Sequence, residues 1–488
     1  MVRNDSKNFM LINKVSEAKA NCFCSNRTAQ NFFPRKESES KFLFDANNPS
    51  GEKNCYYCKV LAMNGSHITS VLWSPTNAYN YNPNNGNINN NNKTNNNYAR
   101  CVRSEKETPS ALFSFENVFN SYTNCRKSKR GTINALKFEE NLEANLRELY
   151  STLNNKTYEP GRSVCFTVLN PKPREIFAAD FKDRIVHHII VGALESIYEP
   201  VFSKDSFACR KQKGTHKAIR HLQRNMRKVT KSNCGRKRAY YLQLDIRNFF
   251  MSIDKQVLFS LIETRVSNYA HWSDEFKQDL LWITKKVIFH DPTINFIQKS
   301  SKKISELVPQ HKSLINVEKG KGLPIGNHTS QFFANVYLNE LDQFIKKELT
   351  CKHYVRYVDD FILLSKSKEE LLNWFWKIKE FLETHLLLNL KNEVKLLPLT
   401  NGIDFLGYIT KPWSIFIRKR VLWNLKNRLL DTRKDLFDRN IFFFEKNSLE
   451  QKSFCNMFSS YKGHFKHANS FTLIKELNKE FPFTRLCC

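Results

Sequence analysis

The sequence predicts an α+β fold in which helices and short strands intermix along the chain. Residues 133–153, 181–202 and 369–386 repeat apolar residues at helical spacing. Residues 240–250 and 353–365 are rich in the β-branched and aromatic residues that strands prefer. Because these segments do not alternate regularly, a doubly wound parallel sheet is not favoured.

The composition changes sharply near residue 105. Before this point periodic apolar patterns are scarce, and asparagine makes up most of residues 77–98. Such a tract has too few apolar groups to offset the entropy of ordering, which is typical of a loop or of disorder. We therefore expect an N-terminal extension over residues 1–105, with the folded part of the chain after it.

The overall charge points to a polyanionic partner. Lysine and arginine number 77 against 47 acidic residues, which gives a formal charge of +30. A surface this basic favours nucleic acid, although a generically basic protein or one that meets an anionic membrane is the alternative. The chain has no run of about 18 apolar residues and does not begin with the apolar core of a secretory signal. We expect a cytoplasmic protein that does not enter a membrane.

Thirteen cysteines are scattered along the chain. With a large core and no export signal, reduced thiols are favoured over a disulfide framework. One group, Cys22, Cys24, Cys55 and Cys58, contains the residue types that bind zinc. Its spacing is irregular, so free thiols are favoured over a structural zinc site.

An acidic pair, Asp359 and Asp360, interrupts two short apolar strands. Adjacent carboxylates in such a place repel each other and lose hydration unless a cation neutralises them. Magnesium suits the position because it takes one or two carboxylates and leaves room for water and phosphates. The alternative is an ordinary polar hairpin turn.

A further carboxylate, Asp245, lies within a strand whose neighbours Leu242, Leu244 and Ile246 indicate burial. Alone it could be a satisfied core aspartate. Together with the acidic pair it completes a set able to hold two Mg²⁺ ions about 4 Å apart, with Mn²⁺ as a possible substitute. Such a set predicts phosphoryl-transfer chemistry.

Between these two acidic strands lies KGLPIGNHTSQFFANVYLNELDQFI, residues 321–345. The order of palm aspartate, Gly-Leu-Pro segment and Tyr-Val-Asp-Asp resembles the reverse transcriptase family. Residues 172–190 and 388–408 are also similar to this family, so the resemblance covers roughly 110–410. It implies a right-hand polymerase with fingers and palm over 106–405 and a helical thumb over 406–488. It also implies an RNA template, a cDNA/RNA hybrid and dNTP substrates.

The resemblance assigns roles to the acidic residues. It implies that Asp245 and Asp359 are metal ligands, with Asp360 as a supporting carboxylate of the catalytic set. Phe250 falls where the family places the aromatic steric gate that excludes a ribose 2′-hydroxyl. Because the chain has 39 phenylalanines, a core position for Phe250 is the alternative.

Basic residues are carried over in the same way. Lys172 and Arg174 resemble the fingers residues that contact the incoming triphosphate, and a guanidinium fork suits phosphate oxygens. A solvated bystander role is the alternative in a chain this basic. Either Lys391 or Lys395 matches the general-acid lysine near the leaving pyrophosphate, and the sequence does not choose between them.

The segment LPIGNHTSQ departs from most bacterial members, which read Gln-Gly and then Ser-Pro. Ile325 replaces the glutamine and Gln331 replaces the proline, and we assign Gly326 and Gln331 to substrate binding. An isoleucine cannot hydrogen-bond near the template base, so checking of the nascent pair should relax. This form, and residues 460–470, resemble enzymes of diversity-generating retroelements. That resemblance implies misincorporation opposite adenine and a small basic accessory protein as partner.

The asparagine-rich tract gains a second interpretation from this resemblance. Residues 72–103 look like the end of the lectin-like proteins that such elements diversify, with asparagine at most variable positions. Asparagine codons begin with two adenines, the base that these elements mutate. We predict a translated template repeat, with a low-complexity linker as the alternative.

Two further functions remain open from the sequence. One is another bacterial reverse transcriptase, of the phage-defence, retron or group II intron type. The other is an RNA-binding protein that kept the fold and lost the reaction, although the presence of all three carboxylates argues against it.

Overall fold

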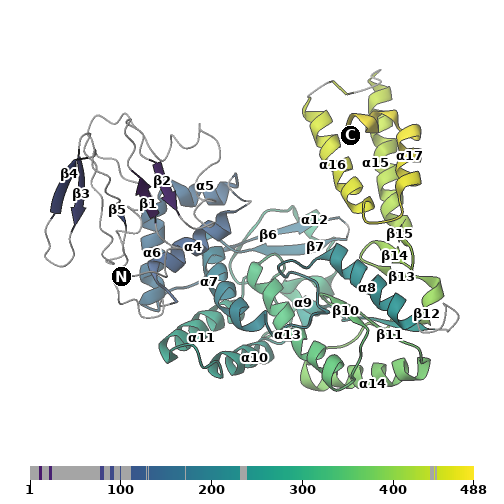
Figure 1. Cartoon of the computed structure of the whole chain (residues 1–488), viewed down its shortest axis with the longest axis horizontal. Coiled ribbons are helices and arrows are strands. Elements are labelled where there is room, and N and C mark those ends of the chain that lie inside the picture. Colours follow the sequence, from purple (N-terminus) through teal and green to yellow (C-terminus); the bar gives the residue numbers. More distant parts are fainter. Residues whose placement is uncertain are drawn as a thin grey trace. The chain divides into compact units, whose positions relative to one another are not determined.

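The computed structural model describes residues 112–487, except 128, 130, 171, 231–238, 440–443 and 446–447. Before residue 112 it describes only the backbone of five short strands. The chain divides into two compact units, Met1–Glu159 with Phe181–Ile189, and Pro160–Asp180 with Ile190–Cys488. Helices and mainly antiparallel sheets intermix, so the predicted α+β class is confirmed (Figure 1).

The first unit contains the strands that precede the helices. β1 (Met10–Asn13) pairs antiparallel with β2 (Asn21–Cys24) and with β5 (Ala99–Arg100). Within the asparagine-rich tract, β3 (Asn77–Tyr81) and β4 (Ile88–Asn92) pair antiparallel. A loop was the expectation from composition, but strand pairing uses backbone groups that every one of these residues carries. The tract therefore contains a β-ladder.

Helices complete the first unit. They are α4 (Phe115–Arg126), α5 (Ile133–Glu140), α6 (Leu142–Asn154) and the first residues of α7 (Phe181–Tyr198). The single helix expected over residues 133–153 is divided at Asn141, whose φ of −127° and ψ of 48° are not helical. Asparagine tolerates such a break because its side chain competes with the backbone for hydrogen bonds. The apolar period continued across the break and did not reveal it.

The second unit contains three sheets and most of the helices. The sheets have the strand orders β10-β11-β8-β12, β7-β6-β9 and β13-β14-β15. The strands are β6 (Ser163–Val168), β7 (Arg174–Ala178), β8 (Tyr240–Asp245), β9 (Phe296–Gln298), β10 (Tyr354–Tyr357), β11 (Asp360–Ser365), β12 (Lys395–Pro398), β13 (Ile403–Phe405), β14 (Tyr408–Thr410) and β15 (Ile415–Ile417). The α-helices are α8 (Thr215–Thr230), α9 (Phe249–Ser252), α10 (Lys255–Ser267), α11 (Asp274–Phe289), α12 (Lys302–Ser305), α13 (His328–Lys347), α14 (Lys368–His385), α15 (Lys419–Asp438), α16 (Leu449–Phe465) and α17 (Phe471–Glu480). The 3-10 helices are η3 (Gln310–Lys312), η4 (Leu314–Asn316), η5 (Leu399–Asn401) and η6 (Pro482–Cys487).

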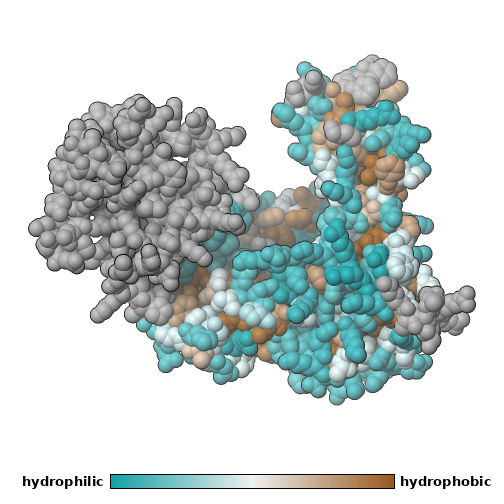
Figure 2. All heavy atoms as spheres, viewed as in Figure 1, coloured by the Kyte–Doolittle hydropathy of each residue, from teal (hydrophilic) through white to brown (hydrophobic). Residues whose placement is uncertain are grey.

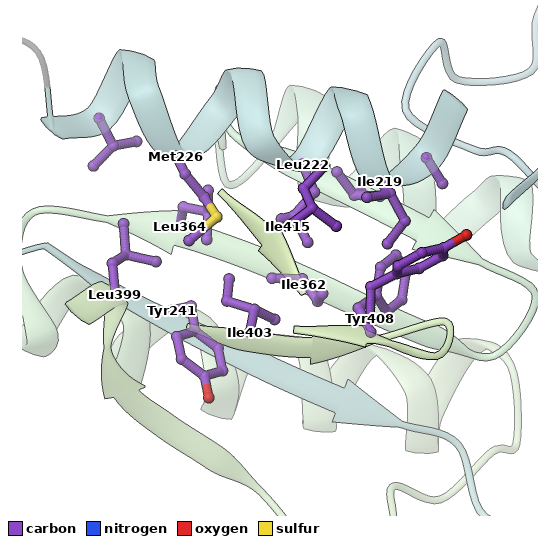
Figure 3. Packing of buried hydrophobic residues seen from close by; sticks show 14 of the residues in the cluster. Ile219, Leu222, Met226, Tyr241, Ile362, Leu364, Leu399, Ile403, Tyr408 and Ile415 are labelled. Carbon is purple, nitrogen blue, oxygen red and sulfur yellow. The ribbon is translucent and has the colours of Figure 1, made fainter. Parts of the chain in front are cut away.

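The four-stranded sheet is covered on both faces by apolar contacts. On one face α8 lies over the sheet, and Figure 3 shows Ile219, Leu222 and Met226 pointing from this helix toward Ile362 and Leu364. On the other face α14 packs against β8 and β11. Successive strand residues point to opposite faces, so a strand covered on both sides needs apolar residues on both faces. The buried leucines, isoleucine and phenylalanine of β8 and β11 meet this need. The sheet is thus a rigid support for residues at its ends.

The C-terminal helices α15, α16 and α17 share an apolar cluster that includes Leu425, Leu429, Phe458 and Leu477. A disulfide joins Cys455 of α16 to Cys487 of η6, whose Cα atoms are 5.0 Å apart. The expectation of reduced thiols therefore fails at this pair. The two residues are 32 positions apart, and only the packing of η6 against α16 brings them together. The other cysteines with described side chains are free, namely Cys125, Cys165, Cys209 and Cys351.

The four cysteines considered for zinc lie outside the side chains that the structure describes. Within the described residues, no helix combines the length and the apolar character that crossing a membrane requires.

Candidate active site

The ends of β8 and β11 bring the three predicted carboxylates together. Asp245 is the last residue of β8 and Asp360 the first of β11, and the two are directly paired across the antiparallel strands. Asp359 lies in the turn between β10 and β11, and its side chain approaches the Asp245 carboxyl within hydrogen-bonding range. Like charges placed directly opposite in a sheet destabilise it. The arrangement therefore requires neutralisation.

The electrostatics of the turn show this cost. Burial and then repulsion by Asp245 raise the pKa of Asp359 from 3.8 to about 6. Burial also raises the pKa of Asp360, to about 7. Repulsion from the other two carboxylates raises this pKa further, whereas a hydrogen bond from Gln243 lowers it. Without a bound cation, protons occupy part of this site near neutral pH. A carboxylate cluster in this state is suited to exchange protons for a metal ion.

Polar neighbours satisfy only part of the cluster. Lys391 Nζ lies 2.6 Å from Asp245 Oδ2. Gln243 Nε2 donates to Asp360 Oδ1 at 3.1 Å and to the Asp404 carbonyl at 3.2 Å. Asp245 Oδ1 is buried and has no hydrogen-bond partner. Two ionised carboxylates can only accept hydrogen bonds, so when both are ionised Asp245 and Asp359 cannot satisfy each other.

The turn that carries Asp359 is strained, and the side chain of Arg356 stabilises it. Val358 has a φ of +56°, which is rare for a β-branched residue. The buried Arg356 donates through Nη1 to the Val358 carbonyl at 3.0 Å. The same guanidinium forms two bonds to Asp342 of α13, at 2.6 and 2.7 Å. This buried ion pair fixes the backbone of the residue that precedes Asp359.

The residues fit a divalent cation that is completed by substrate. Within the described part of the chain, no three or more histidine, cysteine or acidic side chains form a ready-made metal cage. Magnesium commonly takes one or two carboxylates and obtains its other ligands from water and phosphates. Asp245 and Asp359 supply such a pair, and the unsatisfied Asp245 Oδ1 is available as a ligand.

The predicted gate residue Phe250 belongs to the short helix α9, which follows β8 directly. The chain reverses at Asn248, whose φ of +48° is left-handed. Phe250 is half-buried and packs against an apolar cluster formed by Cys165, Phe177, Met251 and Leu314. Its position close behind Asp245 agrees with either interpretation from the sequence, since the ring is part core and part surface.

The LPIGN segment lies against β7 of the three-stranded sheet. The Ile325 side chain packs against the same apolar cluster as Phe250, and its carbonyl accepts from Phe177 N at 3.1 Å. Gly326 has a φ of +119°, and a Cβ there would lie 2.7 Å from Ile176 Cγ2. Only glycine fits this close approach without strain. Gln331 is exposed on the second turn of α13.

Lys172 and Arg174 are exposed at the start of β7. No ion pair or side-chain hydrogen bond involves either residue within the described part of the molecule. The structure therefore leaves both cations free to meet an anion, but it does not bring them into contact with the three carboxylates. Their assignment to the triphosphate stays a prediction.

Basic side chains are concentrated on α8. This helix has no acidic residue, and Lys217, Arg220, Arg224 and Lys228 are exposed. Figure 2 shows a largely hydrophilic surface over the region of α8 and α14. The basic residues of α8 are suited to a polyanion.

Three supporting residues were not found from the sequence. Gln243 bonds to Asp360 of the cluster, Arg356 bonds to the turn at Val358, and Asp342 holds Arg356. A charged residue within an otherwise apolar strand, as at Arg356, was the signal that could have identified one of them. The structure also separates the two candidate lysines, because Lys391 bonds to Asp245 whereas Lys395 acts on Asp360 only through its charge.

Comparisons with known proteins find relatives of part of the chain. The family model described as reverse transcriptase (RNA-dependent DNA polymerase) matches residues 170–410. Protein YkfC of Escherichia coli is 24% identical over 50% of this chain and 58% of its own. The group II intron-encoded protein LtrA of Lactococcus lactis is 24% identical over 46% of this chain and 32% of its own. The retron Ec73 reverse transcriptase of Escherichia coli is 29% identical over 27% of this chain and 34% of its own. The matched region spans less than two thirds of each relative.

Proposed function

Because this chain carries a domain of the reverse transcriptase family, the RNA-dependent DNA polymerases, we propose that the protein copies an RNA template into DNA from dNTPs. The observation that carries the proposal is the meeting of Asp245, Asp359 and Asp360 at the joined ends of β8 and β11. This meeting lies inside the segment that matches the family. Nucleotidyl transfer needs such a cluster and little other protein chemistry.

We assign the three carboxylates different roles. Asp245 and Asp359 would hold the metal, which we propose to be Mg²⁺ with Mn²⁺ as a substitute, and Asp360 would be a supporting carboxylate. When bound, the divalent ions activate the primer hydroxyl and stabilise the leaving pyrophosphate. Arg356 holds the turn so that Asp359 reaches Asp245. Lys391, the lysine that bonds to Asp245, is our choice for the proton donor to the pyrophosphate.

The remaining site residues would bind and select the nucleotide. Lys172 and Arg174 are exposed cations that suit the triphosphate. Phe250 would exclude a 2′-hydroxyl, and Gly326 and Gln331 would contact the nucleotide. The close approach of β7 to Gly326 supports this assignment, because it joins the strand of the basic residues to the LPIGN segment.

Among reverse transcriptases, we favour the diversity-generating type, with errors at template adenines. The support is the departure of Ile325 and Gln331 from the residues most bacterial members carry. The half-buried Ile325 packs among apolar residues and offers no side-chain hydrogen bond to a base. A small basic accessory protein would be a further partner. The alternative is a group II intron or retron type enzyme, which the similarity to proteins of these two kinds supports.

The template-repeat interpretation of residues 72–103 belongs to the same proposal and is tested in the DNA. The asparagine codons should be AAC or AAT, and a near-copy of this stretch should lie nearby, differing only at adenines. If the surrounding DNA holds no such copy, the tract is a low-complexity linker and this support for the diversity-generating type is lost.

The experiment that tests the function is RNA copying followed by sequencing. Purified full-length protein receives a primed RNA containing all four bases, Mg²⁺ and dNTPs, and the cDNA is sequenced. We expect cDNA with errors concentrated opposite adenine. Accurate cDNA would move the protein to the group II intron or retron type. If no cDNA formed on any primed RNA, with Mg²⁺ or Mn²⁺, the proposal of a polymerase would fail.

A further inference from the structure

A buried carboxylate in β7 anchors a segment from far along the chain. Glu175 is only 8% exposed. Its carboxylate accepts from Ser313 Oγ at 3.0 Å and from Leu314 N at 2.7 Å. The segment between α11 and α13 that contains Ser313 and Leu314 is thereby tied to the strand of Arg174. Two hydrogen bonds therefore join Glu175 to this segment.

The anchor uses hydrogen bonds alone. No salt bridge involves Glu175 in the residues that the structure describes, although Arg174 is its neighbour in the chain. Strand alternation explains this, because Arg174 is exposed while Glu175 is buried. Burying an unpaired carboxylate is costly, so this one must satisfy its oxygens through the segment it holds. The arrangement gives Glu175 a specific task rather than a general surface role.

The anchored segment forms a wall beside the predicted gate. Leu314 is 8% exposed and shares the apolar cluster against which Phe250, Val317 and Ile325 pack. Gly322 shows how close the segment comes, since a Cβ there would lie 2.8 Å from Leu314 Cδ1. The same glycine donates its backbone N–H to Ile253, and Leu323 N donates to the Phe250 carbonyl at 2.8 Å. The segment, the LPIGN stretch and α9 are therefore joined by backbone hydrogen bonds and apolar contacts.

We propose that Glu175 and Leu314 are positioning residues for nucleotide selection. They hold residues 313–317 against the apolar cluster on which Phe250 packs, and this fixes the position of the Phe250 ring. The proposal rests on the polymerase function and on the gate role of Phe250. A half-buried ring can exclude a 2′-hydroxyl only if the hydroxyl cannot displace the ring. Leu314 belongs to the cluster against which the ring packs, and the hydrogen bonds of Glu175 hold the loop that carries Leu314 in place.

Single-nucleotide incorporation by the full-length protein on a primed RNA tests this proposal. The measured quantity is the ratio of kcat/KM for a dNTP to that for the matching rNTP. Glu175→Ala and Leu314→Ala should each lower this ratio about tenfold, because small misplacements of a positioned group have effects of this order or larger. The change should come from faster rNTP incorporation, with kcat for the dNTP nearly unchanged. A loss of dNTP and rNTP incorporation in equal proportion would indicate only structural damage and would overturn the proposal.

Matched variants separate positioning from folding. Glu175→Gln can still accept from Leu314 N and bond to Ser313, so it should keep most of the discrimination. Glu306→Ala and Leu307→Ala alter exposed residues of the same segment and should leave the ratio unchanged. If Glu175→Ala does not fold, Ser313→Ala removes one of the two bonds and should lower the ratio by a smaller factor. Unchanged discrimination in Ser313→Ala and Leu314→Ala would refute the proposal.

A double variant gives the sharpest readout. If Leu314 acts through the gate, Leu314→Ala should have no further effect on the ratio in a Phe250→Ala background. Additive effects would show that the wall acts elsewhere. Failure of the polymerase function is distinguishable, because the unmodified protein would then incorporate neither nucleotide, whereas failure of this inference leaves dNTP incorporation intact and sugar selection unaltered.

Discussion

Replacing Asp359 by asparagine should stabilise the metal-free protein at alkaline pH. Asp359 is half-buried and lies beside Asp245. Burial and then repulsion by Asp245 raise the pKa of Asp359 from 3.8 to about 6. The folded protein therefore keeps a proton that the unfolded chain has already released. The free energy of unfolding must fall as pH rises through this window, because the folded state binds more protons there. Asparagine has no such proton to lose.

The size of the effect follows from the displacement of the pKa. A difference of about two units corresponds to about 3 kcal/mol at about 1.4 kcal/mol per unit. The variant should therefore match the unmodified protein near pH 4 and exceed its free energy of unfolding by about 3 kcal/mol near pH 8. Urea unfolding in EDTA at several pH values measures this difference. An exposed aspartate, in Asp438→Asn, serves as the control and should show no such pH-dependent gain.

Magnesium should reverse the order of stability at pH 8. The unmodified protein gains stability on binding the ion, whereas the variant has lost one of the paired carboxylates and should gain less. If the difference between the two proteins were the same at pH 4 and pH 8 in EDTA, the reasoning about repulsion in the cluster would be wrong.

Three other predictions concern the support of the site and its partner. Arg356→Met should destabilise the fold by about 3–5 kcal/mol, because Asp342 is left buried and charged, and adding Asp342→Leu should recover much of the loss in urea unfolding. A single variant no less stable than the double one would contradict this. Gly326→Ala should cost about 1–3 kcal/mol from its positive φ and its contact with Ile176, whereas Gly463→Ala, with open space around it in α16, should cost nothing. Equal effects of the two substitutions would remove the argument from close approach. Binding of a primed RNA should weaken steeply with added salt, since neutralised phosphates release counterions, and affinity that stays flat with salt would exclude a basic groove.

The sequence located the carboxylates because the signal was local. Leu242, Leu244 and Ile246 are buried, as their pattern predicted, so the strand that carries Asp245 belongs to the core. The acidic pair between two apolar strands required a turn, and β10 and β11 form it. Periodicity indicates which face a residue occupies, but only the resemblance to the family assigned the three aspartates to one site.

The supporting contacts could not be predicted because they join distant parts of the chain. Gln243 and Asp360 are 117 residues apart, and Glu175 and Leu314 are 139 apart. No local pattern singled out Glu175 or its partner. The Cys455–Cys487 disulfide escaped for the same reason, since its two residues are 32 positions apart. The break at Asn141 escaped for a different reason, because the apolar period continues across it.

The most direct test of the central claim measures catalysis and binding in the same variants. Asp245→Asn and Asp359→Asn should each abolish extension of a primed RNA under single-turnover conditions with Mg²⁺. Binding of the same primed RNA, followed by fluorescence anisotropy, should remain close to that of the unmodified protein, because basic surfaces supply it. Extension that survives both substitutions would contradict a carboxylate-held catalytic centre at the ends of β8 and β11.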